Sequence, residues 1–131
     1  MNRCSVVREA ALEKCWMQKL NQPSPGRHRF SMIARIWHGR TPVAKGDAYL
    51  AFLIDRAVPD YQSVPGNRSV KILRHNEDGV THFLIITEWE SREAIESFAG
   101  ADIDRAKYYP EDTDFLLEFE PIVTHYELHS Y

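Results

Sequence analysis

Six segments follow one another along the chain in the order strand, helix, strand, strand, helix, strand, which predicts an α+β fold of the ferredoxin-like, split βαβ type. Two observations carry this prediction. Short runs rich in β-branched and aromatic residues end at turn residues, and two stretches between them repeat apolar residues at helical spacing. Such a fold places both helices on one face of a four-stranded antiparallel sheet. The other face carries apolar residues that need a partner, so we expect a homodimer.

The first strand and the first helix are predicted from the residues before the first long turn. Residues 32–38 (MIARIWH) combine β-branched and aromatic side chains, which favours a strand that ends at Gly39. The pair Thr41–Pro42 is typical of a helix start, because Thr can cap a helix and Pro suits its first position. Apolar residues then recur at helical spacing from Ala44 to Ala57, and we expect Pro59 to end the helix.

A β-hairpin is predicted in the middle of the chain. The turn sequence VPGN at residues 64–67 precedes a strand over residues 68–76, whose alternate side chains face opposite sides. Residues 77–79 (Glu-Asp-Gly) indicate a tight hairpin turn, because Asp-Gly accepts the positive φ angles that such turns require. A second long strand is therefore expected over residues 80–89.

The last third of the sequence predicts a second helix and a final strand. Ser91 is placed to open the helix, and Gly100 is placed to end it. Two further short helical stretches are expected over residues 103–107 and 111–117. The final strand is expected over residues 122–128, which completes the four strands of the sheet.

Length, charge and cysteine content exclude several classes of protein. The 131 residues suffice for one compact domain, and a net charge of −3 argues against a dedicated nucleic-acid-binding protein. No apolar run approaches the ~18 residues that a membrane helix needs. Cys4 and Cys15 form neither a disulfide framework nor a CxxC metal motif, so a cytoplasmic protein with reduced thiols is expected.

Charge is distributed unevenly along the chain. Residues 1–31 carry six basic and two acidic side chains, a net +4, whereas residues 88–120 carry three basic and eleven acidic ones, a net −8. Residues 22–27 (QPSPGR) indicate a linker after an amphipathic helix over residues 5–20. We therefore divide the chain into a basic extension and a domain over residues 32–131. The extension is either a loose tail or a segment that docks on the acidic face.

Several separated motifs resemble the antibiotic-biosynthesis monooxygenase domain family. The long motifs are FLIITEWESREAIESFAG at residues 83–100, AKYYPED at residues 106–112 and EPIVTHYE at residues 120–127. The short motifs are WHGRT at residues 37–41 and PGN at residues 65–67. The likeness covers about residues 32–128. It implies a ferredoxin-like monomer that dimerises into an α/β barrel.

The resemblance implies a monooxygenase that oxidises an aromatic, polyketide-like substrate with O2 and without a cofactor. A binding or regulatory module for a small hydrophobic ligand is an alternative, and haem binding or degradation is another. Haem-degrading members use an Asn on the first strand, a Trp on the second helix and a His soon after it. Here the first strand has no Asn, Phe98 takes the Trp position and Tyr108 takes the His position. Haem binding through Tyr108 stays open, because Tyr can ligate haem iron.

Oxygen chemistry without a cofactor requires a base that deprotonates the substrate, and a His with a pKa near neutrality suits this task. His125, within the last strand, is our first candidate. His38, at the end of the first strand, is the second, and Tyr108 is a third catalytic candidate. Each histidine also has a structural interpretation, as a side chain that holds neighbouring strands or lies on the surface.

Aromatic side chains are the candidates for binding a flat, apolar substrate. The predicted substrate-binding residues are Trp37, Tyr49, Phe52, Trp89, Phe98 and Tyr109. The alternative for each of them is packing in the core. No cofactor is expected, because the sequence contains neither a dinucleotide fingerprint nor a phosphate-binding loop. No metal site is expected either, since His75 and His82 on paired strands lack an obvious third ligand.

Overall fold

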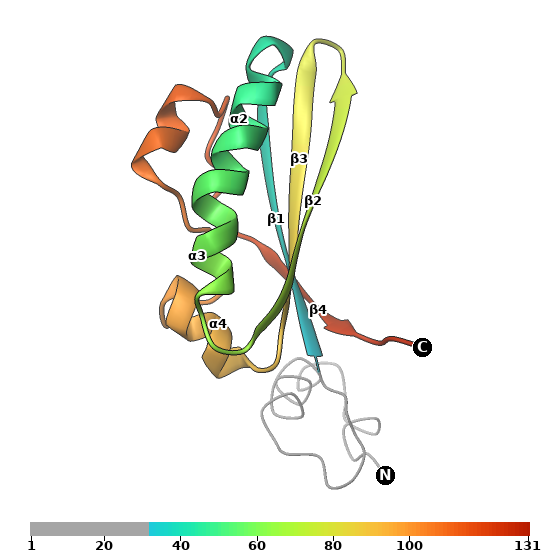
Figure 1. The fold of residues 1–131 in the computed structure, drawn as a ribbon, viewed down its shortest axis with the longest axis vertical. Helices are drawn as coiled ribbons and strands as arrows, with labels where there is room; N and C mark the ends of the chain where they lie inside the picture. The colour runs from blue at the N-terminus through green and yellow to red at the C-terminus, as the bar shows by residue number, and fades with distance from the viewer. Residues whose placement is uncertain (1–31) are drawn as a thin grey trace, which may run out of the picture.

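The computed structural model describes residues 32–131, so the expected helix over residues 5–20 and the linker lie outside the described residues. The strands are β1 (Met32–Pro42), β2 (Asn67–Glu77), β3 (Val80–Trp89) and β4 (Thr124–Leu128). The helical segments are η2 (Val43–Lys45), α2 (Gly46–Phe52), the π-helical η3 (Leu53–Ala57), α3 (Val58–Gln62), α4 (Arg92–Ala99) and η4 (Pro110–Asp114). The strands form one antiparallel sheet in the order β2-β3-β1-β4 (Figure 1), which confirms the ferredoxin-like α+β fold.

The helices lie on one side of the sheet (Figure 1), and residues 117–120 run along the edge of β1, where the Leu117 N–H donates to the Arg40 carbonyl. Side chains alternate across a strand, so the buried odd-numbered residues of β1 and β3 face this layer. The core is built from these side chains and from apolar residues of the helices: Ile33, Trp37, Phe83, Ile85 and Trp89 meet Tyr49, Leu53, Tyr61, Ile95 and Phe98. We call this side of the sheet the helix face and the other side the open face.

The turns predicted from glycine and from Asp-Gly are confirmed. Asp78 and Gly79 take φ angles of 51° and 77° in the turn that joins β2 to β3. Gly66 has a φ of 98°, and a Cβ there would lie 2.5 Å from the Ala94 Cβ. Both the backbone angle and the lack of space therefore require glycine at this position. The Ser91 hydroxyl accepts a hydrogen bond from the Ala94 backbone N–H, which confirms Ser91 as the cap of α4.

The expected end of the first strand at Gly39 was wrong, and so was the helix start at Thr41–Pro42. Strand β1 continues to Pro42, because residues 39–42 pair with Val80–Phe83 of β3. Thr41 is fully buried on the helix face, and its hydroxyl donates to the Pro42 carbonyl instead of capping a helix. Long cross-strand pairing therefore outweighs the local capping preference.

The expected stop at Pro59 was also wrong. The helical path continues through α3 to Gln62, although proline lacks the N–H that an α-helix interior uses. The π-helical turn η3 immediately precedes α3, and its wider winding places Pro59 near the start of a new α-helical segment. A proline is compatible with that position, since the first N–H groups of a helix have no partner within it.

The segment between α4 and β4 contains less helix than the sequence predicts. Residues 103–107 form a turn and an isolated bridge from Arg105 to Ile122 rather than a helix. The helical stretch expected over residues 111–117 is the shorter 3-10 helix η4. The last strand begins at Thr124 rather than at residue 122.

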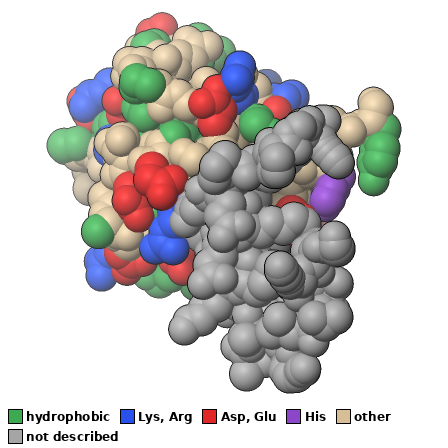
Figure 2. Space-filling model, turned by 90° about the horizontal axis from the view of Figure 1, so that it is seen from below, with side chains coloured by type: hydrophobic (Ala, Val, Ile, Leu, Met, Phe, Trp, Pro, Cys, Tyr) green, Lys and Arg blue, Asp and Glu red, His purple; other side chains and the backbone are tan. Residues whose placement is uncertain are grey.

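Acidic residues of the stretch 88–120 pair with basic residues of other elements. The pairs on the described surface include Lys71–Glu88, Arg68–Glu90, Arg56–Glu111 and Arg40–Glu118. Figure 2 shows the result from below, where acidic and basic side chains lie interspersed on the visible part of residues 32–131. Much of the acidic charge in this stretch is therefore balanced within the domain. Docking of the basic extension lies outside the described residues.

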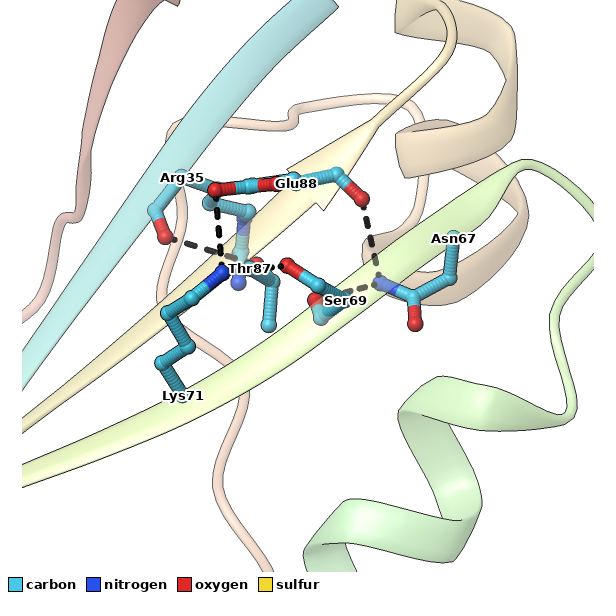
Figure 3. Close-up of polar contacts among 6 residues, drawn as sticks. All are labelled: Arg35, Asn67, Ser69, Lys71, Thr87 and Glu88. Atoms are coloured by element: carbon cyan, nitrogen blue, oxygen red, sulfur yellow. Dashed lines mark hydrogen bonds and ion pairs between the residues drawn. The ribbon is translucent and has the colours of Figure 1, made fainter.

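The open face is polar at both ends and apolar between them. At one end the Lys71 ammonium donates to the Ser69 hydroxyl and to the Glu88 carboxylate (Figure 3). Figure 3 also draws the hydrogen bond from the Thr87 hydroxyl to the Arg35 backbone carbonyl, which lies on the helix face. At the other end lie the histidines of β1, β2 and β3. The apolar side chains between these ends are Ile36, Leu73, Leu84 and Ile86, and Tyr126 of β4 lies in the same row as Glu88.

Candidate active site

His125 and Asp104 form a hydrogen-bonded pair at the edge of the helix face. The His125 Nδ1 lies 3.1 Å from the Asp104 Oδ1, and the His125 side chain is only 5% exposed. The other ring nitrogen, Nε2, is buried and has no hydrogen-bond partner within the described residues. A carboxylate on Nδ1 favours the tautomer that carries its proton there, which leaves the Nε2 lone pair free to accept a proton.

The backbone brings these two residues together from distant parts of the sequence. The Val123 N–H donates to the Asp104 carbonyl at 2.8 Å, and the Ala106 N–H donates to the Pro121 carbonyl at 2.9 Å. These bonds hold the turn after α4 beside the start of β4. Because β4 pairs with β1, His125 then lies opposite Arg35 and on the same face of the sheet.

Arg35 is a buried cation on the helix face. It is 1% exposed, and its Nη2 donates to the backbone carbonyls of Arg105 at 3.0 Å and Ile103 at 3.5 Å. The guanidinium carbon lies 5.6 Å from the centre of the Phe98 ring. The Nε of Arg35 is buried and has no partner within the described residues. Burial lowers the pKa of Arg35, but a guanidinium remains protonated in proteins.

The surroundings of His125 keep its imidazole neutral. Burial lowers the pKa of His125 most, and the positive charge of Arg35 lowers it further, while the Asp104 carboxylate acts in the opposite direction. A neutral imidazole at neutral pH is the form that can accept a proton. Asp104 would then stabilise the imidazolium that forms.

Trp37 adds a third buried polar atom without a partner to the same face. It lies two residues after Arg35 on β1, and its side chain is packed in the core. The indole Nε1 has no hydrogen-bond partner within the described residues, although an indole N–H is usually bonded when buried. The Trp37 ring meets the Tyr108 ring edge-on, with 6.0 Å between their centres. Arg35, Trp37 and His125 thus leave two N–H donors and one acceptor nitrogen without a partner in the described residues, all on the helix face of the sheet.

A model of the antibiotic biosynthesis monooxygenase family matches residues 32–103, which is more than half of the chain. The chain belongs to this family. No curated protein matches the chain significantly. Several solved structures share the fold, and three of them align with the chain as follows. A protein from Shewanella oneidensis aligns with a TM-score of 0.58 and 13% identity, over 78% of this chain and 95% of that one. A conserved protein from Methanosarcina mazei Go1 aligns with a TM-score of 0.57 and 12% identity, over 74% of this chain and 92% of that one. A monooxygenase of Streptomyces coelicolor in complex with the ligand nanaomycin D aligns with a TM-score of 0.50 and 16% identity, over 77% of this chain and 89% of that one.

In this member of the family, the predicted substrate-binding residue Phe98 lies beside Arg35, and Trp89 packs against Phe98. Phe98 stacks on Tyr61 with 4.4 Å between ring centres, and the Lys107 Nζ lies 4.2 Å from the Phe98 ring centre. Trp89 is fully buried against Phe98, and its indole N–H donates to the Thr87 hydroxyl at 2.8 Å. The polar atom of Trp89 is therefore already bonded, and Trp89 is placed as a core residue behind the site.

The remaining predicted substrate-binding residues form a second aromatic group under α2. Tyr49, Phe52 and Tyr109 contact one another or Phe115, with ring centres 5.1–6.1 Å apart. The Tyr49 hydroxyl donates to the buried Asp112, and the Tyr109 hydroxyl donates to Asp60. Burial raises the pKa of both tyrosines and of Asp112. These hydroxyls hold the segment after α4 against the helices, so only their rings remain for a ligand.

The three catalytic candidates are not brought together. His38 projects from the open face, whereas His125 lies on the helix face. The His38 Nδ1 lies 2.6 Å from the Glu120 Oε2, and its Nε2 lies 3.0 Å from the His82 Nδ1. The structure therefore separates His38 from the site of His125 by the thickness of the sheet.

Tyr108 is placed near Trp37, but as a hydrogen-bond donor to the backbone. Its hydroxyl donates to the Glu120 carbonyl at 2.5 Å. Burial, with a smaller effect of the Glu120 charge, raises the pKa of Tyr108 to about 12, so the phenol stays protonated at neutral pH. It is not a base there, and ligation of haem iron would require this hydrogen bond to break. The arrangement does not favour a haem site at Tyr108.

Other site types receive little support within residues 32–131. His75 and His82 do face each other as cross-strand partners, with 6.1 Å between ring centres. However, no group of three His, Cys, Asp or Glu side chains in the described part of the chain is arranged to hold a metal ion. No described helix is long and apolar enough to cross a membrane.

Sequence reasoning missed Arg35 and Asp104. Arg35 had a signal, because a charged residue occupies an inward position of β1 between Ile33 and Trp37. Asp104 had none, since its contact with His125 depends on the irregular chain path between α4 and β4.

Proposed function

We propose that the protein is a cofactor-independent monooxygenase that oxidises an aromatic, polyketide-like substrate with O2. The observation that supports this most is the buried His125 Nε2, which has no partner and belongs to a ring held by Asp104. A base of this kind is what the reaction requires from the protein. Membership of the monooxygenase family and the aromatic side chains around Arg35 agree with it.

The chemistry of an anthrone shows how the reaction balances. His125 Nε2 removes a proton from the methylene carbon, and Asp104 stabilises the imidazolium. The resulting carbanion transfers an electron to O2, the two combine to a peroxide anion, and His125 returns its proton to give the hydroperoxide. His125 then removes the remaining proton from the same carbon as the O–O bond breaks, which leaves a carbonyl group, and it returns this proton to the departing hydroxide to form water. One oxygen atom enters the substrate, the other leaves as water, and the substrate supplies all the electrons.

Oxygen uptake with dithranol, a dihydroxyanthrone, tests this function. We expect the wild-type protein to accelerate uptake over buffer, with formation of the anthraquinone. His125→Ala should lower the catalysed rate by about 100-fold or more, the usual contribution of a general base. His75→Ala is the matched control, because His75 lies exposed on the open face. Both variants should unfold at temperatures within a few degrees of the wild type.

Asp104→Asn separates positioning from base catalysis. It keeps His125 but weakens the preference for the Nδ1–H tautomer, so kcat should fall while KM changes little. Wild-type activity that survives His125→Ala would contradict the proposal. Binding of the product anthraquinone without any oxygen uptake would point to the alternative of a ligand-binding module.

We further propose that the protein is a homodimer whose two sheets pack through their open faces. Leu73 and Leu84 are 46% and 36% exposed on this face, and Tyr126, which lies in the row of Glu88, is 52% exposed. Polar groups flank these side chains, with Lys71 and Glu88 toward one end and His38 and His82 toward the other. An apolar centre with a polar rim is the usual anatomy of a protein interface.

A further inference from the structure

The guanidinium of Arg35 makes no direct ion pair within the described residues, although the Asp104 carboxylate is close enough to favour its charged form. Arg35 is 1% exposed, and no ion pair joins it to a carboxylate within residues 32–131. Its Nη2 donates to two backbone carbonyls, but its Nε–H is sealed from solvent and donates to nothing in the described residues. The nearby Asp104 carboxylate is bonded to His125 instead.

Both the unpaired charge and the unbonded Nε–H of Arg35 lower the stability of the folded protein. A buried charge is costly unless it is paired, and each buried N–H without an acceptor adds a further penalty. Trp37 repeats the second feature on the same face of β1, with an indole Nε1–H that also donates to nothing in the described residues. Two neighbouring donors, one of them on a full positive charge, match a ligand that presents oxygen acceptors and a negative charge.

We propose that Arg35 and Trp37 form the anchor for an ionised oxygen on the substrate. The Arg35 Nε–H donates to a phenolate, enolate or carboxylate oxygen of the substrate. The Trp37 Nε1–H donates to a second oxygen acceptor of the same molecule. The assignment rests on the proposed function for the position of the substrate. It adds the chemical class: a planar aromatic acid rather than a neutral aromatic hydrocarbon.

The position of Arg35 relative to His125 gives this anchor a consequence for the reaction. The two residues are cross-strand partners on β1 and β4, so an oxygen held at Arg35 lies beside the base. Where the bound oxygen belongs to a carbonyl group conjugated with the reacting carbon, removal of a proton by His125 moves negative charge onto that oxygen. A fixed cation at this place stabilises the enolate that forms. Phe98, against which the guanidinium rests, offers a ring surface for the same ligand.

Binding of a pair of probes that cannot turn over tests the anchor independently of catalysis. Anthraquinone-2-carboxylate carries the ionised oxygen and two ring carbonyls, and anthraquinone-2-carboxamide is its neutral counterpart. Neither has the methylene group that the oxidation requires. We expect the full-length wild-type protein to bind the carboxylate about 10- to 100-fold more tightly than the carboxamide, the range for a hydrogen bond to a charged group.

Substitutions in β1 then show which side chain causes the preference for the carboxylate probe over the carboxamide probe. Arg35→Gln should reduce the preference for the carboxylate to within about twofold, and Arg35→Lys should retain part of it because the charge remains. Trp37→Phe should weaken both probes to a similar degree, about three- to tenfold, because it removes one neutral hydrogen bond. Arg40→Gln is the control, since Arg40 lies on the open face and pairs with Glu118.

Two binding results would overturn the assignment. Equal affinity of the wild type for both probes would do so even if Arg35→Gln fails to fold. A folded Arg35→Gln protein that keeps the preference would do so as well. The outcome is separable from the proposed function, because discrimination between the probes without oxygen uptake supports the anchor while removing the monooxygenase. Oxygen uptake with unchanged kcat/KM in Arg35→Gln would support the enzyme while removing the anchor.

Discussion

Gly39 is the position where a single methyl group should disturb the candidate site most directly. A Cβ built on Gly39 would lie 2.3 Å from one ring carbon of Trp37, 2.9 Å from a second and 3.1 Å from a Leu116 methyl carbon. Ordinary contacts begin near 3.4 Å, so the Trp37 ring must move by about 1 Å to admit the methyl group of Gly39→Ala. The ring has little room, because Trp37 is 4% exposed and packs against Tyr108.

The expected cost of Gly39→Ala lies at the upper end of that for an overpacked core, about 2–3 kcal/mol in the free energy of unfolding. For a domain of this size that corresponds to a melting temperature lower by roughly 10–20 °C. Thermal unfolding followed by circular dichroism measures it. Gly79→Ala is the control, with a positive φ but no atom within 4 Å, and should cost only about 1 kcal/mol from backbone strain. A Gly39→Ala protein as stable as the wild type would refute the close packing of Trp37.

Two further predictions concern the open face and the base. In light scattering the wild-type protein should have the mass of two chains of 15.2 kDa. Leu84→Glu places a charge on the open face and should yield folded monomers. A monomeric wild type would exclude the sheet-to-sheet dimer. Burial and Arg35 lower the pKa of His125 in the folded protein, so the unfolded chain takes up this proton at higher pH. The free energy of unfolding should therefore fall as the pH drops below about 6.5, and His125→Gln should flatten this fall in urea titrations at successive pH values.

The fold was predictable because its determinants are local in the sequence. The alternating pattern of β2, the Asp78–Gly79 turn and the Ser91 cap each specify their own few residues and agree with one another. The errors arose where a distant element decides the structure. Thr41 and Pro42 have a local preference for starting a helix, but their pairing with β3 extends the strand.

The candidate site was only partly predictable for the same reason. His125 could be singled out as a histidine within a strand, but the face on which it lies could not be predicted. Its partner Asp104 could not, because nothing local indicates that the turn after α4 returns to β4. His38 and His125 are alike in sequence terms, and only the register of β1 with β4 shows that they project from opposite faces.

The histidines on the two faces of the sheet allow one measurement to test the central claim, that a ligand binds at His125 on the helix face. The protein labelled with 15N at histidine is titrated with anthraquinone-2-carboxylate, and the ring nitrogen signals are followed by NMR. We predict that His125 is neutral with its proton on Nδ1 at pH 7, and that its Nε2 signal moves on saturation while those of His38, His75 and His82 stay in place. Movement of the open-face histidines with an unchanged His125 signal would contradict it.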